Sequence, residues 1–438
     1  ALALAAGGDY AQSKKALELL DQNLRERKTP EDERARAIVL ASRPGGRRES
    51  IRTLEASFNR LRPTPDEEFL LARLYEADRD WDHANEHFLA LVGAKGGANP
   101  SHLAYYILAL LRRKDANEAA IWLARLEALE PDGARTLGLK ARVLYEQRQG
   151  EAASRLVEDY ADKTFKEKKN AAVLGEAASL LEELGRPVEA EKKFREYVKA
   201  VEAEQPEKNL VLAAFLARQK RLAESLDVIE AVWTKCKPET AALTTVASLR
   251  VGGATERDFR RVEVLLREAI ARNPMTANLL VALADLLDAE GKDGEAKTLY
   301  RQILAANPRN ALALNNLAWL LAFQPGKPAE SLDLVKRRIE VTGPSASVLD
   351  TLGVVYLKLG RAEDAVQAFS DSAAQNPTAS IYFHLAEAQM AAGKANEAEK
   401  ASQKAVELGL KGPALSGADL HPLEQADYQK WAARRKGS

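Results

Sequence analysis

Apolar and polar residues follow each other along this chain with the periodicity of short amphipathic helices, and one part of the pattern returns about every 35 residues. In each period a small residue holds the same place, and in most periods an aromatic or aliphatic residue follows four positions later. The recurring positions are Ser13, Ser50, Ala84, Ala119, Ala153, Ala190, Ser225, Val262, Ala296, Ser331, Ala365 and Ala398. Because repetition at this period is typical of stacked helical pairs, the pattern predicts an all-α solenoid of about twelve antiparallel pairs.

The small residues have a steric reason. Two packed helices lie roughly 8 to 10 Å apart, so only small side chains fit where they cross closely. We expect Gly353 and Ala318 on first helices to face Ala365 and Ser331 on second helices. Phe369, one turn after Ala365, then fills the space toward the neighbouring pair.

Glycine and proline mark the expected helix ends. Gly291, Gly360 and Gly393 suit the left-handed cap at the end of a first helix. Asn307-Pro308 and Asn376-Pro377 end second helices, because the proline ring blocks further helix.

The copy between Ala346 and Pro377 carries the most complete set of markers. Leu352, Gly353, Tyr356, Gly360, Ala365, Phe369 and Pro377 fall at repeat positions 7, 8, 11, 15, 20, 24 and 32. This copy resembles the tetratricopeptide repeat, and the copies over 277–310 and 311–342 agree with it. The resemblance implies a right-handed superhelical solenoid over 1–410, most regular at 277–409, followed by a loop and capping helix at 411–438.

Toward the N-terminus the copies keep their phase but lose several markers, most of all around Ser50, Ala153 and Val262. Polar stretches at 95–99, 161–170, 251–256 and 324–327 predict lengthened turns. Gly8-Asp9-Tyr10 resembles an inter-helix turn. We therefore expect the first unit to lack most of its first helix and the chain to be a piece of a longer protein.

After Gly409 the repeat stops. A helix is expected from about Pro422, with Leu423, Tyr428 and Trp431 as its apolar residues. Because the last unit of a solenoid exposes an apolar face, this helix is expected to cap it, with Arg434 to Lys436 supplying a polar outer side. A separate binding segment is the alternative.

Charge and composition argue against nucleic-acid binding and against a membrane-spanning segment. The chain has 64 basic and 64 acidic residues, so no overall field attracts nucleic acid, and we expect no nucleic-acid partner. The lone Cys236 forms no internal disulfide. No run of 18 apolar residues predicts a membrane-spanning segment. The compartment stays open, since the apolar stretch from Ala1 to Ala6 is too short for a signal peptide.

Two motifs resemble metal-binding sites, but their positions within the repeat argue against that interpretation. His83-Ala84-Asn85-Glu86-His87 satisfies the H-x-x-E-H pattern of zinc peptidases, but Ala84 occupies the helix-crossing position of an ordinary repeat. Residues 78–82 begin like a calcium loop, although His83 replaces the required glycine. The interpretation favoured here is an inter-helix turn capped by aspartate. His102, His384 and His421 are isolated in the sequence, so we predict no catalytic residue, cofactor or metal.

The resemblance also implies where a partner would bind. In the family, first helices line a concave face, and repeat positions 2, 5, 9, 12 and 13 meet an extended peptide or another protein. At those positions this chain has Asp285, Asp288, Asn315, Trp319, Phe323, Asp350, Phe383, Glu387 and Met390, and farther toward the N-terminus Arg73, Arg112, Arg142 and Tyr145. Trp319 and Phe323 would anchor an apolar side chain, unless they belong to the core.

A non-enzymatic scaffold that binds protein partners or peptides is the leading interpretation. The lysines and asparagines with which family members clamp a chaperone tail are missing, because position 5 holds Val281, Asn315, Asp350 and Phe383. One alternative is the regulatory or substrate-recognition arm of an enzyme whose catalytic domain is absent here. A less favoured one is an RNA-binding helical repeat, which needs a basic groove that this chain lacks.

Overall fold

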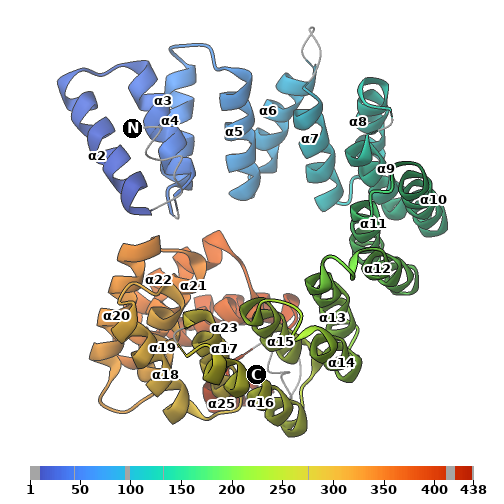
Figure 1. Cartoon of the computed structure of the whole chain (residues 1–438). Coiled ribbons are helices and arrows are strands. Elements are labelled where there is room, and N and C mark those ends of the chain that lie inside the picture. Colours follow the sequence, from blue (N-terminus) through green and yellow to red (C-terminus); the bar gives the residue numbers. More distant parts are fainter. Residues whose placement is uncertain are drawn as a thin grey trace. The chain divides into compact units, whose positions relative to one another are not determined.

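Helices make up the regular structure of the chain. The computed structural model describes residues 10–43, 45–93, 99–131, 133–274, 276–410 and 420–436, and within these ranges it contains helices and turns but no strand (Figure 1). The predicted all-α fold is confirmed.

Two kinds of helix alternate along the chain (Figure 1). Second helices, which contain the recurring small residue, are α2 (Tyr10–Glu26), α4 (Arg47–Phe58), α6 (Trp81–Gly93), α8 (Ala116–Leu129), α10 (Gly150–Lys168), α12 (Pro187–Val201), α14 (Leu222–Val232), α16 (Glu256–Arg272), α18 (Asp293–Ala306), α20 (Pro328–Thr342), α22 (Ala362–Gln375) and α24 (Ala395–Glu407). First helices are α3 (Pro30–Ala41), α5 (Pro65–Ala77), α7 (Pro100–Arg112), α9 (Ala134–Glu146), α11 (Ala172–Glu183), α13 (Asn209–Arg218), α15 (Pro238–Gly252), α17 (Ala277–Ala289), α19 (Ala311–Ala322), α21 (Ala346–Lys358) and α23 (Ala379–Ala391). In the described part of the chain, the single helix α2 is thus followed by pairs that run from α3–α4 to α23–α24.

The recurring small residues lie on the buried sides of the second helices. All of them are buried, none more than 6% exposed, and this includes Ser50, Ala153 and Val262, where the sequence pattern is weakest. At two of these positions the serine hydroxyl has a partner on the facing helix. Ser331 Oγ donates to the Ala318 carbonyl at 2.5 Å, and Ser50 Oγ donates to a first-helix carbonyl at 2.7 Å.

A glycine makes room for an aromatic ring at the crossing of α21 and α22. A Cβ added to Gly353 would lie 2.5 Å from Cε1 of Phe369, whose side chain is fully buried. The ring therefore occupies the space that any larger residue at position 353 would need.

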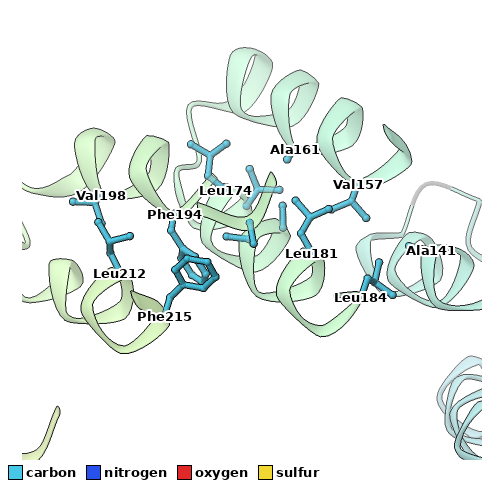
Figure 2. Packing of buried hydrophobic residues seen from close by; sticks show 14 of the residues in the cluster. Ala141, Val157, Ala161, Leu174, Leu181, Leu184, Phe194, Val198, Leu212 and Phe215 are labelled. Atoms are coloured by element: carbon cyan, nitrogen blue, oxygen red, sulfur yellow. The ribbon is translucent and has the colours of Figure 1, made fainter. Parts of the chain in front are cut away.

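Contacts divide the chain into two compact units, residues 1–57 with 238–438 and residues 58–237. In the first unit α2 packs beside α20. In the second, apolar residues of successive helices α9 to α13 form a continuous core (Figure 2). Phe194 of α12 and Phe215 of α13 meet there with ring centres 5.1 Å apart, which joins one pair to the next.

The predicted turns at 251–256 and 324–327 agree with the helix bounds, whereas the turn predicted over 161–170 is wrong. Helix α10 continues to Lys168 because Ala161 is buried and Phe165 packs against the core, and Lys169 ends it in the left-handed conformation (φ 54°). The predicted turn at 95–99 lies almost wholly outside the described residues.

The C-terminal helix follows a short 3₁₀ turn, η2 (Pro422–Glu424), as α25 (Gln425–Lys436). Its apolar residues close the last pair in a cluster of Phe383, Ala405, Leu410, Leu420, Tyr428 and Trp431. Trp431 Nε1 also donates to Ser402 Oγ of α24 at 3.0 Å. Residues 411–419 and 437–438 of the expected loop and cap, and the side chains of Arg434 to Lys436, lie outside the described part.

Candidate partner-binding face

The predicted partner-binding residues of the first unit belong to α17, α19, α21 and α23 or to their ends, and we name the surface of these helices that contacts the C-terminal segment the first-helix face. The chain's own C-terminal segment, residues 420–436, contacts this face. His421 Nε2 lies 2.9 Å from Asp288 Oδ1 of α17, and Asp427 Oδ2 accepts from Lys358 Nζ of α21 at 3.0 Å. Residues on several successive first helices therefore hold one short stretch of chain.

His384 of α23 lies at the centre of the contact. Its Nδ1 donates to Asp350 Oδ1 at 2.8 Å, its Nε2 donates to Glu424 Oε1 at 2.5 Å, and the residue is 5% exposed. Burial alone lowers the pKa of His384, but the facing Asp350 and Glu424 carboxylates raise it well above its ordinary value. The ring is thus an imidazolium at neutral pH. Because both nitrogens are occupied, it has no lone pair with which to take a proton from a substrate.

Glu424 is held from two sides. Burial by itself raises the pKa of its carboxyl, yet the His384 imidazolium outweighs that effect and the pKa is lowered. Its second oxygen, Oε2, accepts from the His421 backbone N–H at 2.8 Å, which fixes the turn that precedes α25. The carboxylate is therefore placed by local backbone geometry as well as by its partner.

The tautomer of His421 follows from its neighbours. The backbone N–H of Leu423 donates to His421 Nδ1 at 3.2 Å, so that nitrogen carries a lone pair. The proton is then on Nε2, which donates to Asp288. Asp288 consequently acts as an acceptor for a neutral hydrogen-bond donor on the bound segment.

Lys358 joins an ionic contact to an aromatic one. Its Nζ lies 4.5 Å from the ring centre of Phe323 while it pairs with Asp427. Burial raises the pKa of the Asp427 carboxyl, but the Lys358 ammonium outweighs this effect, so the pKa is lowered. The Phe323 ring therefore makes a cation–π contact with the Lys358 ammonium, which in turn pairs with Asp427 of the segment.

Trp319 lies among the other aromatic rings of the face. Its ring centre is 5.6 Å from Phe323, 6.0 Å from His384 and 6.1 Å from His421. Trp319 Nε1 and Asn315 Oδ1, one turn apart on α19, are both shielded from solvent, and neither makes a hydrogen bond. Leaving a buried polar group unpaired costs about 1 to 3 kcal/mol, so α19 has a donor and an acceptor that remain to be satisfied.

Asp285 has a structural role. Its Oδ1 accepts from Tyr300 Oη at 2.5 Å and from Asn316 Nδ2 at 2.9 Å, and burial raises its pKa. This carboxylate bridges α18 and α19 instead of facing outward. Of the acidic residues predicted on α17, Asp288 is the one that reaches the C-terminal segment.

The three residues predicted on α23 have different environments. Phe383 is 2% exposed beneath Tyr428 and Trp431, which gives it a packing role. Glu387 lines a cavity of about 40 Å³ with Phe323 and other residues of the face. Met390 is 43% exposed and remains open to solvent.

In the second unit, Arg73 and Arg112 flank one aromatic ring. The guanidinium carbons of both lie 5.2 Å from the ring centre of Tyr105, and Arg73 is also 5.6 Å from that of Phe69. Arg112 pairs with Glu76 at 2.6 Å, and Tyr105 Oη donates to the same carboxylate. The expected basic surface is therefore partly neutralised by an acid of the preceding repeat.

The same compensation recurs at α9. Arg142 forms a two-pronged pair with Glu183 of α11, through Nε at 2.7 Å and Nη2 at 2.6 Å. Tyr145, one turn farther on, is 40% exposed. An acidic partner would thus have to compete with internal carboxylates here.

The residues of the zinc-like motif have internal partners. His83 Nδ1 lies 2.7 Å from Asp80 Oδ2, His87 Nδ1 lies 2.6 Å from Glu68 Oε1, and both rings stack on Tyr75. Asp80 also accepts from the His83 backbone N–H, so it caps the turn as expected. Across the ranges that the structure describes, no group of three or more histidines, cysteines or acids is arranged to hold a metal ion.

Sequence reasoning missed the residues that the C-terminal segment brings to this face, namely His421, Glu424 and Asp427, together with Lys358 and His384 opposite them. His384 and His421 are separated in the sequence but approach the same tryptophan. Their repeat positions alone carry no signal for this pairing, because His421 lies beyond the repeats. None of the helices in the described residues has the length and apolarity to cross a bilayer.

Comparison with known proteins agrees with the repeat architecture. A TPR repeat-containing protein of Pseudomonas aeruginosa is 24% identical over 122 residues, which are 28% of this chain and 21% of that protein. The chain thus matches about a fifth of this relative's length.

Two solved structures are among those that the chain matches. A thermophilic TPR protein of Thermus thermophilus is 22% identical, with 44% of this chain and 98% of that chain covered and a TM-score of 0.37. Yeast Tom70 is 12% identical, with 97% and 92% covered and a TM-score of 0.44. The family model described as the tetratricopeptide repeat matches residues 125–409, more than half of the sequence. The chain therefore belongs to the tetratricopeptide-repeat family.

Proposed function

We propose that this chain is a non-enzymatic scaffold that binds a peptide or protein segment along its first helices, with the first-helix face of α17 to α23 as the main site. The observation that carries this proposal is the seating of the chain's own C-terminal segment on that face. Asp288, His384 and Lys358, from three different first helices, each contact it through a side chain.

The chemistry of the face favours recognition over catalysis. Its central histidine has both nitrogens engaged by carboxylates, and its aromatic rings are packed beside charged groups. Aromatic and charged side chains of this kind dominate the binding energy of protein interfaces. Membership of the tetratricopeptide-repeat family supports a role in protein interaction in general.

A site-specific photocrosslinking experiment tests the proposal. The photoreactive amino acid p-benzoylphenylalanine replaces Met390, which is exposed on the first helix α23, and in a second variant Tyr145 on α9. Matched controls carry it at Ile121 and Val188, which are 64% and 78% exposed on second helices. The full chain is irradiated in lysate of its source organism.

We expect a discrete crosslinked protein from position 390, and not from positions 121 and 188. All four positions are solvent-accessible, so accessibility alone does not produce such a difference. Crosslinks that arise from the second helices alone would refute binding along the first helices.

A further inference from the structure

We propose that residues 420–427 are an intramolecular ligand of the first-helix face, and that the partner segment taken by this face carries two carboxylates one helical turn apart. The inference rests on the proposed function and deepens it, because it specifies the chemistry of the partner. It comes from the contacts that the C-terminal segment makes.

The segment presents its acids in a regular order. Glu424 is the last residue of the 3₁₀ turn η2, and Asp427 lies three residues later in the first turn of α25, so one short helical stretch of chain presents both acids. Glu424 meets the imidazolium of His384, and Asp427 meets the ammonium of Lys358. A peptide with the same spacing of acids would find the same two cations.

One further contact defines the orientation of the bound segment. His421 lies three residues before Glu424 and donates to Asp288. Along the bound chain, the first-helix face therefore contacts a hydrogen-bond donor through Asp288, then a carboxylate through His384, then a second carboxylate through Lys358. Asp350, behind His384, keeps that ring charged and aimed at the first carboxylate.

The internal segment is an incomplete occupant. The ring centre of Trp319 lies 6.1 Å from that of His421, yet Trp319 Nε1 and, one helical turn earlier, Asn315 Oδ1 make no hydrogen bond and are shielded from solvent. The backbone of an extended peptide offers both an acceptor and a donor. A partner that also reaches these two groups would gain hydrogen bonds that the C-terminal segment does not make.

Apolar residues flank the polar contacts of the segment. His421, Glu424 and Asp427 contact the first-helix face. Leu420 before them, and Tyr428 and Trp431 after them, pack with Phe383 and other residues of the end cluster. These anchors keep the polar part at a high effective concentration near its site, so an external peptide meets an internal competitor.

The experiment measures binding of a fluorescein-labelled peptide with the sequence of residues 420–436 to the full chain by fluorescence anisotropy. A weakened chain carries Glu424→Ala, Asp427→Ala and Trp431→Ala in its own segment. We expect the labelled peptide to bind this chain at least tenfold more tightly than the unmodified chain. Adding His384→Gln to the weakened chain, or Glu→Gln with Asp→Asn in the peptide, should remove that gain.

Equal binding to the weakened and unmodified chains, or binding that survives His384→Gln, would overturn the inference. Since Trp431→Ala removes part of the end cluster, a second variant with only Glu424→Gln and Asp427→Asn is followed by hydrogen exchange. Exchange over 420–427 should rise at least tenfold, with helix α24 unchanged, and unaltered exchange there also overturns the inference. Neither the anisotropy nor the exchange measurement involves the native partner. The proposed scaffold role is therefore tested separately, by the photocrosslinking experiment.

Discussion

Replacing Gly353 by alanine tests the helix crossing on which the positions of the first-helix face depend. The new Cβ would lie 2.5 Å from Cε1 of Phe369 and 2.7 Å from two further ring carbons. Favourable carbon contacts lie near 3.5 to 4.0 Å, so the ring has to move by about 1 Å. Phe369 is fully buried, with its ring centre 5.4 Å from that of His384, which leaves little room for this movement.

The expected cost combines two opposing effects. Overpacking costs about 1 to 3 kcal/mol, whereas replacing glycine by alanine inside a helix stabilises by up to about 1 kcal/mol. Gly294 in α18 is the matched control, because a Cβ there would have no heavy atom within 4 Å. We expect Gly294→Ala to be neutral or stabilising, and Gly353→Ala to be less stable than this control by about 1 to 3 kcal/mol.

Urea unfolding followed by circular dichroism gives the difference in free energy of unfolding between the two variants. Because a long repeat array can unfold in several steps, hydrogen exchange in α21 and α22 serves as the local measure. A faster exchange should appear there in Gly353→Ala and be absent in Gly294→Ala. If both variants had the same stability and exchange, the close approach of α21 and α22 at this point would be refuted.

Three other changes test the second-helix side of this crossing, an inter-helix turn and the C-terminal segment. Ala365→Leu should overpack the same crossing from the second helix and lower the free energy of unfolding by about 1 to 3 kcal/mol, and an unchanged melting temperature would contradict that position. Arg148→Gly should stabilise by up to about 1 kcal/mol in thermal unfolding, because Arg148 has φ 63° in an inter-helix turn, while the same change at Gln149, which has φ −100°, should not stabilise. The lowered pKa of Glu424 and the raised pKa of His384 predict a pH dependence of the C-terminal segment. The stabilisation of the docked segment by the Glu424 carboxylate is fully present above pH 4.5, the ordinary pKa, and is lost as the pH falls through the lowered pKa. The stabilisation by the His384 imidazolium is fully present below pH 6.5 and is lost only as the pH rises through the raised pKa. Exchange over 420–427, corrected for the chemical rate, should therefore rise as the pH falls below 4.5 and through the lowered pKa of Glu424, and a flat profile would contradict the ion pairs.

The repeat could be predicted from the sequence because its cause is local and recurrent. Each close crossing requires a small residue at one position, so even Val262 in a weak copy is fully buried at that position. The copies around Ala84, Ala119, Ala153 and Ser225 lack the glycine marker because Arg79, Lys114, Arg148 and Lys220 occupy their left-handed turn positions. In the C-terminal copies glycine holds the corresponding places. The left-handed turn conformation of the backbone is thus retained in copies where another residue replaces the marker glycine.

The contacts of the C-terminal segment could not be predicted in this way. His421 and Asp288 are 133 residues apart, and the segment lies beyond the last repeat, so no period connects the two. Family positions predicted Asp288, Trp319, Phe323 and Asp350 as partner-binding residues, and Asp288 is the one of these four that hydrogen-bonds the C-terminal segment directly. Which chain lies on that face depends on three-dimensional placement, which the repeat pattern does not encode.

The ionic contacts and the apolar cluster of the C-terminal segment have different physical effects. A buried ion pair contributes little net stability, because the cost of removing both charges from water offsets their attraction. The apolar packing of Tyr428 and Trp431 against Phe383 is therefore the main source of affinity within the chain. The pair between His384 and Glu424 instead selects one position for the segment, since a shift along the face would leave buried charges unpaired. Selection by charge combined with modest net stability is what the exchangeable occupant proposed above requires.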